Sequence, residues 1–198
     1  MLSFAAAVFL LIVTPGPGVL SVAGVGSGFG FRAGNRYLAG LWLGNNAVAL
    51  LVASGIAAVV LAEPVIRTVL LFASVAYLLY LAGRIALAGS KIAFIEKQSP
   101  PGLLNGLTLQ LINPKAYAVH TTLFGGFPFL PTDLFAETLI KFVVMNVIWI
   151  PLHYLWLGAG LSLRRLDLAP GVQRAINVGM ALAMLGVVAL ALLAPSAA

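Results

Sequence analysis

The chain contains no cysteine and very little charge. Without cysteine it can form no disulfide, no thiolate metal site and no thiol redox relay. Only 8% of its 198 residues are charged, whereas an average soluble domain carries about 25%. Too few polar groups are present to cover a soluble catalytic domain, and we therefore expect a protein that is not an enzyme of that kind.

Acidic side chains are the scarcest charged groups, with five Asp and Glu in the whole chain. All of them fall between the long apolar runs or at their ends: Glu63, Glu96, Asp133, Glu137 and Asp167. This placement argues against a carboxylate proton relay, a site for a hard metal ion and hydrolysis by paired carboxylates. The histidine spacing fits no metal motif, so neither a metal nor a cofactor is expected.

Apolar residues make up 62% of the chain. They form runs of about 20 residues, the length that a helix needs to cross a hydrocarbon core roughly 30 Å thick. The sequence therefore predicts an all-α integral membrane protein, a six-helix bundle forming a single transmembrane domain over 1–198. The six spans are expected at Leu2–Val25, Ala39–Leu61, Val65–Ala88, Leu103–Phe124, Leu139–Gly160 and Val172–Leu193. The first run has no Lys or Arg before it and no cleavage signal, so we expect a retained helix.

The net charge of +6 indicates topology rather than nucleic-acid binding, because the basic residues stand singly between apolar runs. Those that follow spans one, three and five are Arg32, Arg36, Arg84, Lys91, Lys97, Arg164, Arg165 and Arg174. The opposite side has only Arg67 and Lys141, and Lys115 lies inside span four. Because cytoplasmic loops are enriched in Lys and Arg, both termini are predicted outside the cytoplasm.

The two halves of the chain share a layout. Pro15 interrupts the first span of one half and Pro114 the first span of the other, 99 residues later. Asn45 and Asn46 in span two are matched by Asn146 in span five. Because three is odd, a repeated three-helix unit must be inverted in the membrane. The pattern predicts two inverted repeats, about 1–95 and 100–198, with broken first and fourth helices, as in secondary transporters. Coincidental proline spacing is the alternative.

The segment Thr14-Pro15-Gly16-Pro17-Gly18 cannot continue as an undisturbed helix, because two prolines remove backbone donors and fix φ. In lipid such a break is tolerated only against protein or water. Its free carbonyls suit an ammonium group and its free N–H groups suit a carboxylate. We therefore interpret Thr14, Pro15, Gly16 and Pro17 as substrate-binding residues, with a simple kink as the alternative.

The segment Asn113-Pro114-Lys115 repeats this arrangement in span four and supplies the second set of substrate-binding candidates. An unpaired ammonium inside a membrane is costly, so such a charge usually faces a pathway or a partner. Lys115 is predicted to bind a substrate carboxylate or to take part in a protonation step. The alternative is that it reaches the membrane interface instead.

Further polar candidates lie inside or beside the spans. Asn45 and Asn146 are interpreted as secondary substrate contacts, or as hydrogen bonds between helices. His120 and His153 join Lys115 as proton-coupling candidates, because imidazole titrates near neutral pH. The alternative is that each histidine is a hydrogen-bonded residue that packs between helices. The pattern Gly40-x-x-x-Gly44 indicates close packing of two helices.

At these residues the chain resembles the LysE/RhtB family of bacterial amino-acid exporters over nearly its whole length. The matching pieces are Thr14-Pro15-Gly16-Pro17, the helix start at Gly40 to Gly44, Tyr77 to Gly83, Gly106, and Asn113-Pro114-Lys115-Ala116. The resemblance implies a six-helix exporter in the bacterial inner membrane, driven by the proton gradient. Members commonly carry an acidic residue or Asn where this chain has Gly18 and Val19, and many have Asp near the position of Asn45. That departure favours a neutral substrate, with Lys115 or a histidine taking part in coupling.

The sequence thus predicts a secondary active exporter of an amino acid or another small zwitterion, embedded in the lipid bilayer, with no nucleic-acid partner. A bundle of 198 residues has little interior in which to hold polar breaks, which favours a homodimer. Three alternatives stay open: export of a divalent metal or another solute, a membrane scaffold subunit, and a membrane-embedded enzyme. No convincing nucleophile or acid–base pair supports the last of these.

Overall fold

The structure is a computed structural model that describes residues 1–14, 16–86, 99–166 and 168–193. The regular secondary structure in these ranges is entirely α-helical, which confirms the all-α prediction. The helices are α1 (Leu2–Val13), α2 (Pro17–Phe29), α3 (Phe31–Ala53), α4 (Ile56–Ala62), α5 (Pro64–Ala86), α6 (Leu103–Ile112), α7 (Pro114–Gly126), α8 (Leu134–Arg165) and α9 (Pro170–Leu193).

Several of the described helices have the length and composition of membrane spans. Two do so alone, α5 over Pro64–Ile85 and α8 over Leu134–Arg165. Two further candidates are bent pairs, α1 with α2 and α3 with α4, which bend by 51° and 85°. α6 is apolar but short. Apolar side chains such as Phe72, Leu79 and Val147 are exposed on the long helices, as expected of surfaces that face lipid.

The first and fourth predicted spans are both interrupted just before a proline that begins a new helix. α1 ends at Val13 and α2 begins at Pro17; α6 ends at Ile112 and α7 begins at Pro114. Proline suits the first position of a helix because its missing N–H needs no partner there. The two predicted breaks are therefore present in the fold.

The second predicted span, Ala39–Leu61, is wrong as a single helix. α3 begins at Phe31, eight residues before the expected start, so Gly40 and Gly44 lie inside the helix rather than at its beginning. It ends at Ala53, where Gly55 takes a left-handed conformation with φ of +78°. Glycine alone adopts this conformation at little cost, and the chain turns sharply there into α4.

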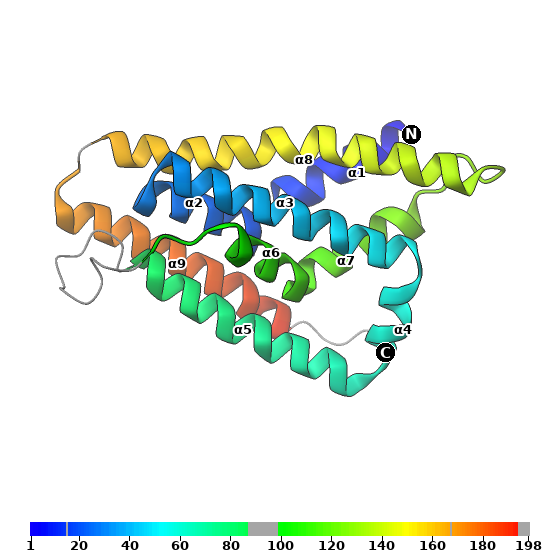
Figure 1. The fold of residues 1–198 in the computed structure, drawn as a ribbon, viewed down its shortest axis with the longest axis horizontal. Helices are drawn as coiled ribbons and strands as arrows, with labels where there is room; N and C mark the ends of the chain where they lie inside the picture. Colours follow the sequence, from blue (N-terminus) through cyan, green and yellow to red (C-terminus); the bar gives the residue numbers. More distant parts are fainter. Residues whose placement is uncertain (15, 87–98, 167, 194–198) are drawn as a thin grey trace.

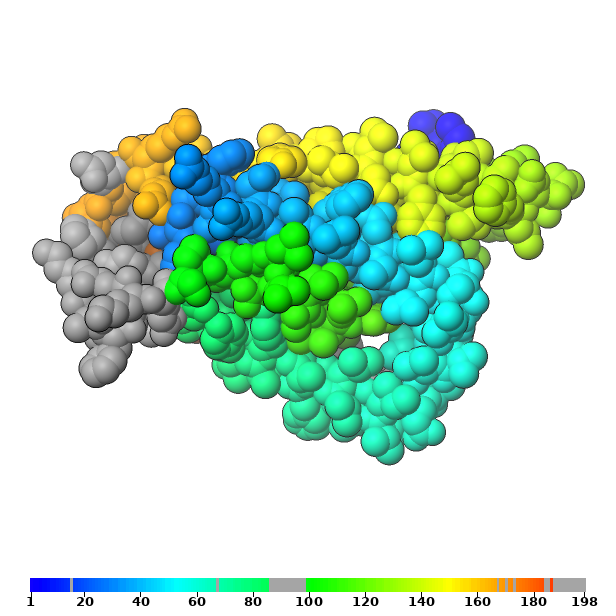
Figure 2. Space-filling view, viewed as in Figure 1, coloured from blue at the N-terminus to red at the C-terminus, as the bar shows by residue number. Residues whose placement is uncertain are grey.

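The helices pack in layers that bring the two breaks to the middle of the molecule. α8 lies along one edge and α5 with α9 along the other, with α2, α3, α6 and α7 between them (Figure 1). The α1–α2 pair packs along α8, and the α6–α7 pair packs along α3. Figure 2 shows α3 and the α6–α7 pair in continuous contact across one face.

Glycines allow these helix pairs to approach closely. A Cβ atom at Gly40 would overlap the Leu103 carbonyl oxygen, and one at Gly106 would overlap the Tyr37 carbonyl oxygen. At Gly44 it would lie 2.7 Å from Cβ of Gln110. The packing role predicted for Gly40-x-x-x-Gly44 is confirmed, and its partner is α6.

Candidate functional site

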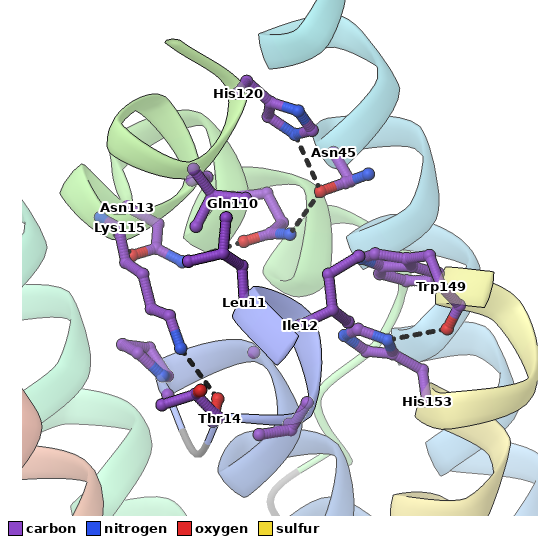
Figure 3. Close-up of a pocket in the computed structure, with 16 residues that line it drawn as sticks. Leu11, Ile12, Thr14, Asn45, Gln110, Asn113, Lys115, His120, Trp149 and His153 are labelled. Carbon is purple, nitrogen blue, oxygen red and sulfur yellow. Dashed lines mark hydrogen bonds between the residues drawn. The ribbon is translucent and has the colours of Figure 1, made fainter. Parts of the chain in front are cut away.

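A cavity of about 60 Å³ lies where the two helix breaks face each other (Figure 3). Its lining comes from the ends of α1, α2, α6 and α7 and from the sides of α3 and α8. A volume of this size has room for a few water molecules. An amino acid would therefore need side chains around the cavity to move before it could enter fully.

The first break brings the end of α1 and the start of α2 to the cavity. Thr14 and Gly16 are extended, and the first intrahelical donor of α2 is the N–H of Leu20, which bonds the Gly16 carbonyl at 3.0 Å. The N–H groups of Gly18 and Val19 come before that bond and have no acceptor within α2. This helix start carries a partial positive charge, and the end of α1 carries a partial negative one.

The structure places Lys115 at the cavity, against the opposite break. Its Nζ donates to the Thr14 carbonyl oxygen at 2.7 Å, and its backbone N–H donates to Oδ1 of Asn113 at 3.1 Å. Its side chain lies beside Gly16, where a Cβ atom would be 2.9 Å from Cδ of Lys115. An ammonium group thus already occupies the carbonyl end of the first break.

A chain of buried amides connects the second break to α3. Nδ2 of Asn113 donates to Oε1 of Gln110 at 2.9 Å, and Nε2 of Gln110 donates to Oδ1 of Asn45 at 3.4 Å. The same Asn45 oxygen lies 3.1 Å from Nε2 of His120 (Figure 3). Asn45 and His120 therefore reach the cavity as one network, which includes Gln110, a residue that the sequence reasoning missed. Its isolated amide within the apolar run just before Asn113 was an available signal.

The far wall of the cavity is formed by Trp149 and His153 on α8. Their rings stack with centroids 3.5 Å apart and an interplanar angle of 15°. Nδ1 of His153 bonds the Trp149 carbonyl oxygen at 2.9 Å. Trp149 was also missed by the sequence reasoning, because only tertiary packing sets an apolar residue of a span against a polar break.

Two of the predicted site residues, Pro114 and Asn146, are not among the residues that line this cavity. Pro15 lies outside the described residues. Pro114 occupies the first position of α7. Asn146 faces α3, where it exchanges two hydrogen bonds with Asn46 at 2.8 and 3.1 Å and accepts one from Nε1 of Trp42 at 2.6 Å.

The reciprocal amide pair of Asn46 and Asn146 should couple α3 to α8 in a measurable way. We expect Asn46→Ala and Asn146→Ala to be non-additive in their free energies of unfolding, with a coupling of about 0.5–1.5 kcal/mol, as for other hydrogen bonds between membrane helices. A double-mutant cycle in detergent micelles measures this coupling. Strict additivity of the two single effects would show that the pair contributes nothing.

Lys141 is a buried charge within α8. It was counted among the basic residues on the side opposite the cytoplasm, and it lies within α8 with 2% of its side chain exposed. Its Nζ pairs with Oε1 of Glu137 at 2.8 Å and donates to the Phe124 carbonyl oxygen at 3.0 Å. Among the described residues no cluster of three metal-ligating side chains is found.

Comparison with known proteins now identifies the family. The sequence model of the LysE type translocator matches residues 9–195, nearly the entire chain. The chain belongs to the LysE type translocator family. This is a family of membrane transporters, not of enzymes, and the described spans agree with that assignment.

The curated relatives of this LysE-type chain include leucine efflux proteins. That of Enterobacter sp. (strain 638) is 30% identical over 121 residues, which cover 59% of this chain and 57% of the relative. That of Klebsiella pneumoniae is 32% identical over 124 residues, covering 60% and 58%. That of Salmonella typhimurium is 30% identical over 123 residues, covering 60% and 58%. The match thus spans less than two thirds of these relatives. No solved structure gives a significant match to the chain.

Proposed function

We propose that this LysE-type protein is a secondary active exporter of an amino acid with an apolar side chain, exchanged for protons across the bacterial inner membrane. The observation that supports this most directly is the meeting of two helix breaks at one cavity, with Lys115 of one break bonded to Thr14 of the other. Breaks that converge in this way provide a polar site inside an apolar protein.

The groups around the cavity match the two charged ends of a zwitterion. The Thr14 carbonyl accepts the Lys115 ammonium and is equally suited to the ammonium of a substrate. The N–H groups of Gly18 and Val19, at the positive end of α2, suit a carboxylate. Leu11, Ile12, Val19 and Val119 add apolar surface to the same cavity, which fits an aliphatic side chain. Since the relatives are leucine efflux proteins, leucine is the first substrate to test.

We further propose six membrane spans arranged as inverted repeats over about 1–95 and 100–198. Residues at equivalent positions in two such repeats can touch only near the axis that relates them. Three pairs separated by 99 or 100 residues do so: Asn46 with Asn146, Asn45 with Met145, and Gly16 with Lys115. The packing of each broken helix pair along the second helix of the other half supports the same arrangement.

The orientation proposed from charge agrees with where the connections lie. The junction of α2 and α3, beside Arg32 and Arg36, lies at the same end of the molecule as the connection after Arg165 (Figure 1). The N-terminus and the connection between α7 and α8 lie at the other end. We therefore propose that both termini face away from the cytoplasm, as the positive-inside rule predicts. Assembly as a homodimer is kept as part of this proposal.

Exchange in proteoliposomes tests the proposed function. Vesicles that contain the purified chain and an internal pool of unlabelled leucine should accumulate external labelled leucine transiently above equilibrium. Leucinamide, which lacks the carboxylate, and 4-methylpentanoate, which lacks the ammonium, should compete at least ten times less well than isoleucine, because each loses one charged contact. Vesicles without protein provide the background.

A negative result in that assay has a definite meaning. If folded protein exchanges none of the proteinogenic amino acids, amino-acid export is excluded as its function. Equal competition by leucinamide and isoleucine would instead contradict the recognition of a zwitterion and favour export of another class of solute.

A further inference from the structure

His153 differs from the other titratable groups at the cavity in the direction of its available lone pair. The side chain is 3% exposed and comes from the middle of α8. Its Nδ1 lies 2.9 Å from the Trp149 carbonyl oxygen. A carbonyl oxygen can only accept a hydrogen bond, so Nδ1 carries the proton. In the neutral ring Nε2 therefore bears a lone pair.

That lone pair faces the cavity beside the start of α2. A Cβ atom at Gly18 would lie 3.7 Å from Nε2 of His153 and 3.9 Å from Oε1 of Gln110, but glycine leaves this space open. No hydrogen-bond partner of Nε2 is found within the described part of the chain. Nε2 thus points to the space next to the N–H groups of Gly18 and Val19, where we place the substrate.

His120 does not present a lone pair to this space. Its Nε2 faces Oδ1 of Asn45, an oxygen that also accepts from Gln110, so Nε2 of His120 is the donor. The remaining lone pair on Nδ1 is sealed from solvent and has no partner among the described residues. Nζ of Lys115 donates to the Thr14 carbonyl oxygen, and while it is charged it has no lone pair to offer.

We propose that Nε2 of His153 is the atom at which a proton and the substrate ammonium exclude each other, an inference that rests on the proposed export function. One lone pair either binds a proton, which makes a second N–H and an imidazolium, or accepts a hydrogen bond from an ammonium N–H. A protonated His153 beside Lys115 also repels a further cation in a cavity this small. Binding of the amino acid from the cytoplasm therefore requires a neutral ring.

The exchange balances in protons and charge. A proton from the outer aqueous phase adds to Nε2 after the amino acid leaves, and it returns to water on the cytoplasmic side before the next amino acid binds. One proton enters for each zwitterion exported, and because the zwitterion has no net charge, one positive charge moves inward per cycle. Both the pH gradient and the membrane potential then drive export.

The surroundings of His153 add few competing titratable groups. α1 and α2, which pack against α8, contain none in their described residues. α3 contributes Tyr37, whose hydroxyl donates to Ser21, while its Arg32 and Arg36 are exposed near its start. From α7 the cavity receives Lys115 and His120. Lys115, His120 and His153 are thus the titratable groups at the cavity, and of these we expect His153 to give the pH response of substrate binding.

The test compares proton-driven accumulation with exchange in the same proteoliposomes. In the unmodified protein, with the membrane potential held at zero, an imposed pH gradient should raise leucine accumulation by up to about tenfold per pH unit, the limit for one proton per leucine. His153→Gln keeps an oxygen acceptor but cannot take up a proton, so its ratio of driven to undriven flux should fall to about one. His120→Gln is the matched control and should keep the response to the gradient, whatever its basal rate.

A second measurement does not depend on whether the His153 variant folds. Addition of leucine to the unmodified protein in weakly buffered micelles should release up to one proton per bound leucine, at pH values low enough for the His153 ring of the empty protein to be protonated. An indicator dye detects the release across a series of pH values. A protein that binds and exchanges leucine without proton release overturns the inference and leaves the export function standing. Retention of the gradient response in His153→Gln also overturns it. Absence of any amino-acid exchange in the unmodified protein removes both proposals.

Discussion

Replacement of Gly160 by alanine is expected to destabilise the folded protein by about 1–3 kcal/mol, the usual cost of forcing an extra carbon into a packed interface. A Cβ atom at this position of α8 would overlap the Ala23 carbonyl oxygen of α2. The three nearest atoms, O, C and Cα of Ala23, all belong to the main chain, so no side-chain rotation relieves the clash, and α8 must shift away from α2. Because α2 and α8 carry Gly18 and His153 to the cavity, the shift should also slow leucine exchange. Reversible unfolding in mixed micelles measures the free energy.

Gly158 provides a control two residues earlier on the same helix. No atom lies within 4 Å of the position that its Cβ would occupy. Gly158→Ala should therefore leave the fold unchanged or stabilise it by up to about 1 kcal/mol, because alanine is the better helix former. Similar losses in the two variants would show that helix propensity or insertion, rather than close contact with α2, determines the effect.

Much of the fold could be predicted because hydropathy indicates where membrane helices lie and the prolines indicate where two of them break. A run such as Leu134–Arg165 is identified by its hydropathy alone, since no soluble structure tolerates so many exposed apolar residues. The breaks at Pro17 and Pro114 could be predicted because proline lacks a backbone N–H, although proline alone does not end a helix, since Pro151 lies inside α8. These are local properties that need no knowledge of packing.

Features that depend on tertiary contacts were not predictable in the same way. Gly55 reads as one more glycine in an apolar run, and its left-handed turn becomes evident only in the fold. Lys141 counted in the sequence only as a charge on the side opposite the cytoplasm, and nothing local showed that Glu137 and the Phe124 carbonyl oxygen would bind it in the interior. The site was found in part: Thr14 and Lys115 meet as two matched breaks should, whereas Trp149 gave no signal before it was seen against His153.

Replacement of Lys115 by methionine should reduce leucine transport more than any other single change at the cavity. Methionine has a similar length but no charge, so the Thr14 carbonyl loses its ammonium partner and a substrate carboxylate loses a cation. A hydrogen bond to a charged group contributes about 1.5–3 kcal/mol, which corresponds to a rise of roughly 10- to 150-fold in the KM for leucine. Initial rates of exchange over a range of leucine concentrations measure it.

The result must separate substrate binding from a structural tie between the two breaks. If Lys115 binds the carboxylate, Lys115→Met should discriminate poorly between leucine and leucinamide. The variant lacks the cation that favours the ligand with a carboxylate. Gly16→Ala is the matched comparison: its added carbon lies 2.9 Å from Cδ of Lys115 and displaces a flexible side chain while the charge stays. It should weaken leucine binding less and keep the discrimination. If Lys115→Met retains the preference for leucine over leucinamide while its melting temperature falls, Lys115 only joins α1 to α7, and the N–H groups of Gly18 and Val19 must recognise the carboxylate alone.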